Sequence, residues 1–290
     1  MKSVAIVGLG LIGGSLGLAL KRHLPDVEVI GVARRHETVD TAIAIGAVDR
    51  AGTELALVRD ADLVVLACPL AATAGVLEES APHLAEGARV TDVGSVKGTV
   101  VAHAATVLDR ERNPFLGGHP MAGKEVTGIG HADADLFRGR PWLFTPWPGG
   151  GDEPRWEDYF QAIRAIGGLP VFLPPERHDR YVAMISHLPF LLSAAFLVAA
   201  GDQEDWAEAS ELASSGFRDI SRLGAGDPEM YAAIAGMNRE EILRSWGALH
   251  EALDMFEAAM ARGEEAALLA LFESARGTRR SWAEEHPGLA

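Results

Sequence analysis

One short turn near the amino terminus constrains the fold of this chain more than any other feature. An apolar run, VAIV (4–7), leads into GLGLIGG (8–14), and a helix-like segment follows at 11–23. The glycines match G-x-G-x-x-G between a predicted strand and a predicted helix. The first glycine permits a tight turn, the second a close backbone approach, and the third close helix–strand packing at an anion-attracting helix terminus. The pattern predicts a dinucleotide-binding turn of Gly8, Leu9, Gly10, Leu11, Ile12 and Gly13.

Strand and helix patterns alternate through the first half of the chain. We predict strands at 4–8, 27–32, 62–68, 88–94 and 114–118, with helices at 11–23, 36–46, 70–85 and 97–110. This alternation indicates βαβ units and therefore a parallel sheet. Further strands are expected at 140–147 and 169–173, on either side of a Pro/Gly-rich loop (146–154) and a helix.

The pattern changes at Pro174. Beyond it, segments rich in Ala, Leu and Glu predict helices only, at 203–215, 228–262 and 263–284. We therefore predict an α/β fold with a Rossmann-like parallel-sheet domain at 1–173, followed by an all-helical dimerisation domain at 174–290.

One stretch of the helical half resembles a membrane span. Residues 181–201 contain no Asp, Glu, Lys or Arg, and about 20 apolar residues suffice to cross a bilayer. Ser186, His187 and Pro189 interrupt the run, so we interpret it as a helix buried in a protein core or a dimer interface. We expect a homodimer formed through this half and no membrane association.

Composition limits the partners and the compartment. The formal net charge is -15, from 41 acidic and 26 basic residues, and such a surface repels nucleic acid. The one cysteine, Cys68, allows no disulfide within the chain, which fits a reducing cytoplasm. The apolar run near the amino terminus is too short for a signal peptide. We expect a cytoplasmic protein with a small-molecule ligand and no metal.

Two arginines bear on which dinucleotide binds. NAD sites usually carry Asp or Glu at the end of the second strand, but here Arg34 and Arg35 occupy that region. A guanidinium group suits a ribose 2′-phosphate, so NADP is favoured, although NAD remains open if both arginines are only surface charges. Cys68 and Pro69 end the next long strand and are expected to line the same crevice.

The segment GGHPMAGK (117–124) contains a histidine among glycines. Its G-x-x-x-x-G-K spacing resembles a phosphate-binding P-loop, but Glu125 replaces the required Ser or Thr, and Pro120 removes a backbone donor. His119 instead follows a predicted strand at the cofactor edge, where an imidazole can accept a proton from an alcohol that loses hydride. Ser95, at the end of another predicted strand, is placed to orient the imidazole or a hydroxyl.

Polar groups also occur within the helical half. Ser186 and His187 lie in an otherwise apolar helix, and the segment 214–231 contains Asp219 and Arg222 between helices. Such a loop can hold a substrate carboxylate, or it can be an ordinary connection with surface charges.

Five segments occur in order: GLGLIGGSL, TDVGSVK, GGHPMAG, ISHLPF and SSGFRDISR with DPEMY after it. Each of the four later segments is more specific than the glycine pattern. Together they resemble the prephenate/arogenate dehydrogenase family of tyrosine biosynthesis over almost the whole chain. The resemblance implies a Rossmann domain, a helical dimerisation domain and no appended regulatory domain. It also implies oxidative decarboxylation of a cyclohexadienol acid.

The resemblance further implies roles for single residues. His119 would accept the hydrogen bond of the ring 4-hydroxyl while hydride leaves for the nicotinamide, and Ser95 would lie beside that hydroxyl. The remaining implied substrate contacts are Ser186, His187, Asp219, Arg222 and Tyr231, the last reaching in from the partner subunit.

Two positions depart from the family pattern. Phe190 stands where many prephenate-using members have histidine, which suits arogenate or either substrate. Lys124 stands where a small hydroxyl residue is common, and it either contacts an anionic substrate or faces water.

Two other functions are compatible with parts of the sequence. A β-hydroxyacid-type dehydrogenase of similar layout would use Lys97 as its catalytic group. A non-enzymatic NADP-sensing module would bind the cofactor and use its helical half to bind a partner.

Overall fold

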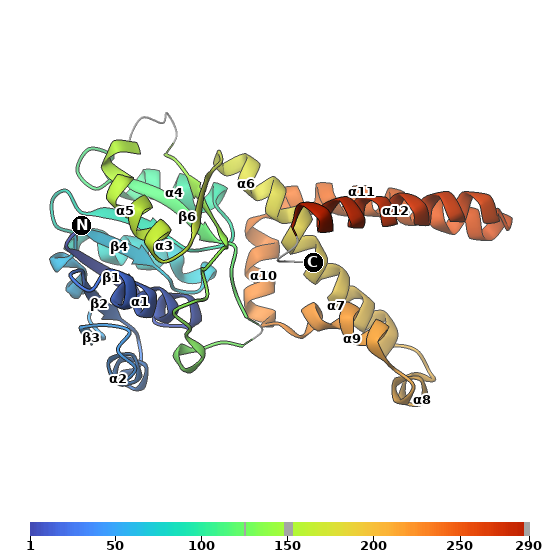
Figure 1. Ribbon diagram of the computed structural model, residues 1–290, viewed down its shortest axis with the longest axis horizontal. Helices are drawn as coiled ribbons and strands as arrows, with labels where there is room; N and C mark the ends of the chain where they lie inside the picture. Colours follow the sequence, from blue (N-terminus) through green and yellow to red (C-terminus); the bar gives the residue numbers. More distant parts are fainter. Residues whose placement is uncertain (125, 148–152, 287–290) are drawn as a thin grey trace. The chain divides into compact units, whose positions relative to one another are not determined.

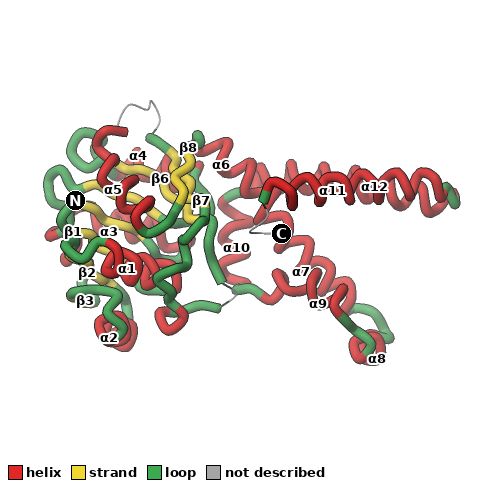
Figure 2. The backbone as a smooth tube through the Cα atoms, in the orientation of Figure 1, coloured by secondary structure: helices red, strands yellow, loops and turns green. Residues whose placement is uncertain are grey.

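The computed structural model describes residues 1–124, 126–147 and 153–286 (Figures 1 and 2). Glu125 and the centre of the predicted Pro/Gly-rich loop lie outside these residues. The contacts divide the chain into two compact units, Met1–Arg239 and Glu240–Ala290.

The first unit is built on one eight-stranded sheet with the order β3-β2-β1-β4-β5-β6-β7-β8. The strands are β1 (Ser3–Val7), β2 (Glu28–Val32), β3 (Arg50–Gly52), β4 (Leu63–Leu66), β5 (Arg89–Asp92), β6 (Phe115–Pro120), β7 (Pro141–Thr145) and β8 (Leu169–Phe172). The Rossmann-like prediction is confirmed, with β3 as an unpredicted short edge strand.

One pair of neighbouring strands departs from the predicted parallel order. β7 runs antiparallel to β6, while every other pair in the sheet is parallel. The β6–β7 connection contains the 3-10 turn η4 (Ile129–His131) where a crossover helix would be needed for parallel pairing.

Helices cover the sheet on both faces. Alternate β1 residues such as Val4 and Ile6 share a core with side chains of α1 (Leu11–His23), α2 (His36–Ala44) and α5 (Glu153–Ala165). The intervening Ala5 and Val7 are also buried and point to the opposite face, because successive strand residues alternate. The remaining helical elements of this half are η1 (Leu55–Asp60), η2 (Leu70–Ala72), α3 (Thr73–Ser80), η3 (Ala81–His83) and α4 (Gly98–Val107).

Among the described residues after β8, the regular elements are all helical, as predicted. They are α6 (Pro175–Val182), the π-helical turn η5 (Ala183–His187), α7 (Leu188–Gly201), α8 (Trp206–Glu211), α9 (Ser215–Ser221), the 3-10 turn η6 (Arg222–Ala225), α10 (Pro228–Met237), α11 (Arg239–Arg262) and α12 (Glu265–Glu285). The helix predicted over 228–262 is interrupted at Asn238. The division into domains at 1–173 and 174–290 stays a prediction.

The apolar stretch expected to be buried forms part of one continuous helical run, Pro175–Gly201. Within the described residues, this is the one helix long and apolar enough to cross a membrane by length and composition, and 28% of its apolar window is buried. Burial in the core of the same chain was therefore the wrong alternative. Met184, Ile185, Phe196 and Val198 are exposed, so an apolar face of this run is uncovered in the single chain.

Close packing of α1 allows a test of the fold outside the glycine turn. A Cβ added to Gly17 would lie 2.2 Å from the Ala47 carbonyl oxygen, whereas one added to Gly75 of α3 would meet no described atom within 4 Å. We expect Gly17→Ala to lower the free energy of unfolding by about 1–3 kcal/mol through overpacking. Gly75→Ala should raise it by up to about 1 kcal/mol, since alanine is the better helix former. Urea unfolding followed by circular dichroism measures both, and equal effects would contradict the tight contact at Ala47.

Candidate active site

The glycine turn lies where the strand order of the sheet reverses. β1 and β4 are neighbours there, although two strands separate them in sequence. In open α/β sheets, ligands bind beyond the carboxyl ends of the strands at this point. Gly8 has a φ of 105°, and an added Cβ would lie 2.5 Å from the backbone of Ala67 at the end of β4. Only glycine combines that conformation with that contact.

The rest of the turn leaves an open backbone surface. A Cβ on Gly13 would lie 2.0 Å from the Gly8 carbonyl oxygen, so α1 can approach β1 this closely only with glycine at that position. Gly10 caps α1 without a side-chain hydrogen bond, and a Cβ there would meet no described atom within 4 Å. The first turn of α1 also lacks an acidic residue. Its N–H groups thus suit a pyrophosphate, and the turn fits a dinucleotide. Leu9 and Leu11 are buried beneath it, and Ile12 is half-buried.

Arg34 and Arg35 stand at the same edge of the sheet. Both are exposed just after β2, whose last residue, Val32, pairs with Val7 before the glycine turn. Burial raises the pKa of the Cys68 thiol, and the positive charge of Arg34 acts in the opposite direction. Cys68 and Pro69 directly follow β4 and Ala67 at this edge.

His119 lies within β6, not after the strand as predicted. Its neighbour on β7 is Leu143. Both preceding glycines are required by packing, since a Cβ on Gly118 would lie 2.5 Å from the Asp92 carbonyl oxygen and one on Gly117 2.1 Å from Thr145. The GGH sequence thus brings His119 to the carboxyl edge of β6 between two closely packed strands.

A buried ion pair supports this edge. The Lys97 ammonium donates to the Asp92 carboxylate and, at 2.8 Å, to the Gly118 carbonyl oxygen. Asp92 also accepts from the Gly118 N–H at 3.1 Å. Burial lowers the pKa of Lys97, and the charge of Asp92 opposes that shift. Because the ammonium is fully buried with partners from the chain itself, the geometry disfavours Lys97 as a catalytic group.

His119 continues into a second hydrogen-bonded chain. Its Nδ1 lies 2.9 Å from Nε2 of His178 on α6, and Nδ1 of His178 lies 2.8 Å from Oδ1 of Asp179. The Asp179 carboxylate also accepts from the backbone N–H groups of Lys97 and Gly98, both at 2.7 Å. One carboxylate thus connects α6, the amino terminus of α4 and His119. Since Nδ1 of His119 is occupied, Nε2 is the nitrogen left for a ligand.

Asn238 joins His187 to the same cluster. Its Nδ2 donates to the Asp179 carbonyl oxygen at 2.9 Å and lies 3.0 Å from Nδ1 of His187. His187 ends the π-helical turn. Pro189, which follows after Leu188, lacks the N–H that a regular helix would use, which explains the locally widened turn. Ser186 is half-buried beside it.

Phe190 and Tyr231 form a stacked pair near His187. Their ring centroids are 3.9 Å apart with an interplanar angle of 1°, and the Tyr231 hydroxyl donates to the Leu223 carbonyl oxygen at 2.6 Å. The ring centroids of Phe190 and His187 are 6.0 Å apart. Tyr231 packs on Phe190 within its own chain, and its implied approach to the partner's site stays a prediction.

Burial keeps all three histidines of the cluster neutral near pH 7. It lowers the pKa of His119 well below the usual range, helped by the positive charges that His178, Lys97 and His187 can carry. Burial also lowers the pKa of His178, against the influence of Asp179. The pKa of His187 falls to about 4, mainly through burial. A neutral His119 can accept a hydrogen bond, as a proton-abstracting group requires.

The other predicted substrate residues have different surroundings. Lys124 is paired with Asp133 at 3.0 Å, and Asp219 with Arg218 at 3.0 Å, all at the surface. Ser95 is half-buried between β5 and α4, and Arg222 is exposed where η6 packs against α7. Their roles toward a substrate stay predictions.

Four residues of the cluster were not predicted from the sequence. They are Asp92, His178, Asp179 and Asn238. Two features of the sequence could have identified three of them. Asp92 is an acid at the end of a buried strand (VTD, 90–92), and His178 and Asp179 are adjacent polar residues at the start of a very apolar helical run. No feature of the sequence identified Asn238 as a member of the cluster.

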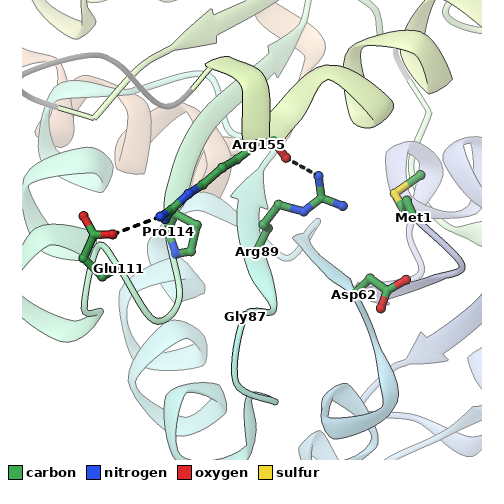
Figure 3. Close-up of a pocket in the computed structure, with 7 residues that line it drawn as sticks. All are labelled: Met1, Asp62, Gly87, Arg89, Glu111, Pro114 and Arg155. Carbon is green, nitrogen blue, oxygen red and sulfur yellow. Dashed lines mark hydrogen bonds and ion pairs between the residues drawn. The ribbon is translucent and has the colours of Figure 1, made fainter.

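A cavity of about 380 Å³ lies elsewhere on the sheet (Figure 3). Its lining includes Met1, Asp62, Arg89 and Pro114, each at or just before the start of a strand, so it lies at the amino edge, opposite the glycine turn. The charges around it are paired, Arg155 with Glu111 at 2.9 Å and Arg89 with Asp158.

The fold and the site together define the class of protein. A glycine turn at the switch point of a Rossmann sheet, with a neutral histidine at the same edge, is the arrangement of a nicotinamide-dependent dehydrogenase. The family model "Prephenate dehydrogenase, nucleotide-binding domain" matches residues 16–166, and "Prephenate dehydrogenase, dimerization domain" matches residues 174–274. The chain belongs to the prephenate/arogenate dehydrogenase family and is an NAD(P)-dependent oxidoreductase with that activity.

Individual relatives agree with this assignment. Prephenate dehydrogenase of Bacillus subtilis is 31% identical over 96% of this chain and 75% of its own length. The structure of Synechocystis arogenate dehydrogenase has a TM-score of 0.83 at 34% identity, covering 97% of this chain and 99% of that one. Aquifex aeolicus prephenate dehydrogenase, solved with hydroxyphenyl propionate and NAD+, has a TM-score of 0.90 at 27% identity, covering 97% and 98%.

The neutral histidines predict a specific pH dependence of stability. Their folded-state pKa values lie below the unfolded value of 6.5, so only the unfolded chain takes up these protons as the pH falls. The stabilisation is full above pH 6.5 and decreases below it, by up to about 1.4 kcal/mol per pH unit for each histidine. We expect the free energy of urea unfolding to decrease from pH 7 to pH 5.

The strongly shifted carboxyl group, Asp158, does not affect the pH dependence of the free energy of unfolding between pH 5 and pH 7. Burial would raise the pKa of Asp158, but Arg89 and the amino terminus lower it, so its contribution is lost only below about pH 4. His187→Gln removes one of the three histidines and should flatten the pH dependence. A free energy of unfolding that stays constant between pH 5 and pH 7 would show that the cluster is not held neutral.

Proposed function

We propose that this enzyme oxidises and decarboxylates prephenate or arogenate with NADP as the preferred acceptor, and that His119 is its catalytic residue. One observation carries the assignment of His119. His119 lies at the carboxyl edge of the sheet that bears the glycine turn, with its Nδ1 bonded to His178 and its Nε2 available to a ligand.

The chemistry follows from this placement. When bound, the nicotinamide ring supplies the acceptor for the hydride that leaves the hydroxyl-bearing ring carbon. Nε2 of His119 accepts the hydrogen bond of that hydroxyl and draws off its proton as the carbon–oxygen double bond forms. The ring carboxylate then departs as carbon dioxide, its bonding electrons enter the ring, and the phenolic oxygen recovers the proton. The product is 4-hydroxyphenylpyruvate or tyrosine.

The preference for prephenate or arogenate is proposed to depend on the side chain at position 190. Phe190, stacked on Tyr231, presents an aromatic face where many prephenate-using relatives have a histidine, which suits arogenate or either acid. Ser95, Ser186, His187, Asp219 and Arg222 are proposed as further substrate contacts, Arg222 through a substrate carboxylate. Lys124 is the remaining proposed contact with an anionic substrate, although it is paired with Asp133.

We also propose a cytoplasmic homodimer. The uncovered apolar face of the Pro175–Gly201 run supports a second copy as its cover, because a patch containing Met184, Ile185 and Phe196 is unfavourable in water. The single cysteine supports a reducing compartment.

Replacing the proposed proton acceptor tests the reaction. We expect His119→Asn to reduce kcat about 10²–10⁴-fold, the usual contribution of a positioned acid or base. The KM for the cyclohexadienol acid should change by less than about threefold, because the hydrogen bond matters mainly in the transition state. Absorbance of the reduced nicotinamide, measured with prephenate and with arogenate, gives both constants. A kcat within threefold of the unsubstituted enzyme would rule out His119 as the acceptor.

The cofactor preference has its own test. We expect the double substitution Arg34→Ser, Arg35→Ser to raise the KM for NADP at least about tenfold, through loss of charge-assisted hydrogen bonds worth about 1.5–3 kcal/mol. The KM for NAD should change by less than about threefold. Initial rates with each cofactor at saturating substrate provide the comparison.

The matched control is Arg59→Ser. Arg59 is an exposed arginine in η1, just before β4, and so lies at the opposite edge of the sheet. It should leave both constants unchanged. Equal or better kcat/KM with NAD in the unsubstituted enzyme would overturn the NADP preference.

A further inference from the structure

The two-histidine chain behind His119 ends on a carboxylate that can act only as an acceptor. Asp179 receives the backbone N–H groups of Lys97 on Oδ1 and of Gly98 on Oδ2, each at 2.7 Å. His178 makes a third contact, with Oδ1. Together the three contacts hold the carboxyl group in one orientation. Because backbone N–H groups only donate, both carboxyl oxygens of Asp179 act as acceptors here. Nδ1 of His178 must then carry the hydrogen that faces Oδ1.

The proton arrangement along the rest of the chain follows. His178 is fully buried, and burial lowers its pKa, so it is neutral and its Nε2 is unprotonated. An unprotonated Nε2 can only accept. The 2.9 Å contact with His119 therefore requires the hydrogen on Nδ1 of His119. Neutral His119 is left with a bare Nε2, the form that accepts a hydrogen bond.

Charged groups around the cluster act in both directions. The charge of Lys97 lowers the pKa of His119 and of His178. Asp179 and Asp92 oppose the lowering of the pKa of His178 by burial. The Lys97 ammonium lies between β5 and α4, paired with Asp92, and its charge lowers the pKa of His119. His187, at the end of the π-helical turn, acts in the same direction. Asp179 is the one acid hydrogen-bonded to the three-histidine cluster within the described residues.

We propose that His178 and Asp179 are positioning residues that fix His119 in its Nδ1–H tautomer, so that Nε2 faces the substrate hydroxyl as a hydrogen-bond acceptor. This inference rests on the proposed role of His119. In the opposite tautomer Nε2 would be a donor and could not take the hydroxyl proton. In a serine protease triad, loss of the group that sets the histidine tautomer costs about 10⁴-fold in kcat.

Two substitutions of His178 separate positioning from packing. The amide of Asn reaches about as far as Nδ1 of histidine, so His178→Asn can keep the contact with Asp179 but not the contact with His119. The amide of Gln reaches about as far as Nε2, so the oxygen of His178→Gln can accept from His119. We expect kcat to fall about 10²-fold in His178→Asn and less than about tenfold in His178→Gln. The KM for the substrate should stay within about threefold in both.

A purely structural role predicts a different order. The anchored Asn variant would then be at least as stable and as active as the Gln variant, and thermal unfolding midpoints of both measure this. His23→Gln, at the exposed end of α1, is the control for loss of an unrelated imidazole and should match the unsubstituted enzyme. An Asn variant as active as the Gln variant would overturn the proposal.

The tautomer itself can be observed without turnover. In protein labelled with ¹⁵N-histidine at about pH 7.5, the His119 resonances are those missing from His119→Asn. We expect a protonated Nδ1 and an unprotonated Nε2 in the unsubstituted and Gln enzymes, and Nε2–H in the Asn variant. A protonated Nε2 in the unsubstituted enzyme would overturn the proposal even if the enzyme is active. If neither prephenate nor arogenate is turned over, the proposed function fails, and the ¹⁵N spectra still decide the tautomer.

Discussion

The buried carboxylate of Asp179 is the interaction on which the catalytic edge depends. It accepts from the first N–H groups of α4 and from His178, while its backbone carbonyl accepts from Asn238 before α11. Helix α6, the loop after β5 and the end of α10 are thereby joined at one residue. An uncompensated carboxylate at this depth would cost several kcal/mol, so these donors have to be present together. Through His178, the same carboxylate is connected to the imidazole of His119.

The second constraint is the close approach of strands and helices at the carboxyl edge. Gly8 and Gly13 allow β1, β4 and α1 to meet without side chains between them, and Gly117 and Gly118 do the same for β6 and its neighbours. The glycines of the two motifs thus serve a common purpose. They bring a bare helix terminus and an imidazole to the same edge of one sheet.

The predictions from sequence succeeded where the signal was local. The glycine spacing predicted the turn, and short apolar runs predicted seven of the eight strands. They failed where the outcome depended on contacts between distant residues. The antiparallel return of β7 is explained by the absence of a crossover helix among the described residues between β6 and β7. β3 is a three-residue edge strand stabilised by its pairing with β2. Lys97 had the appearance of a reactive lysine because its partners, Asp92 and Gly118, are identifiable only in the folded chain.

The sequence by itself determined the fold class, the glycine turn and the family, because strand periodicity, glycine spacing and motif order can be identified in the chain without its tertiary contacts. Only the tertiary structure decided which nitrogen of His119 is available. That depends on His178 and Asp179, 59 and 60 residues further along the chain, and on burial that keeps each imidazole neutral. Hydrogen-bond partners and desolvation arise from packing, and no local pattern of residues specifies them.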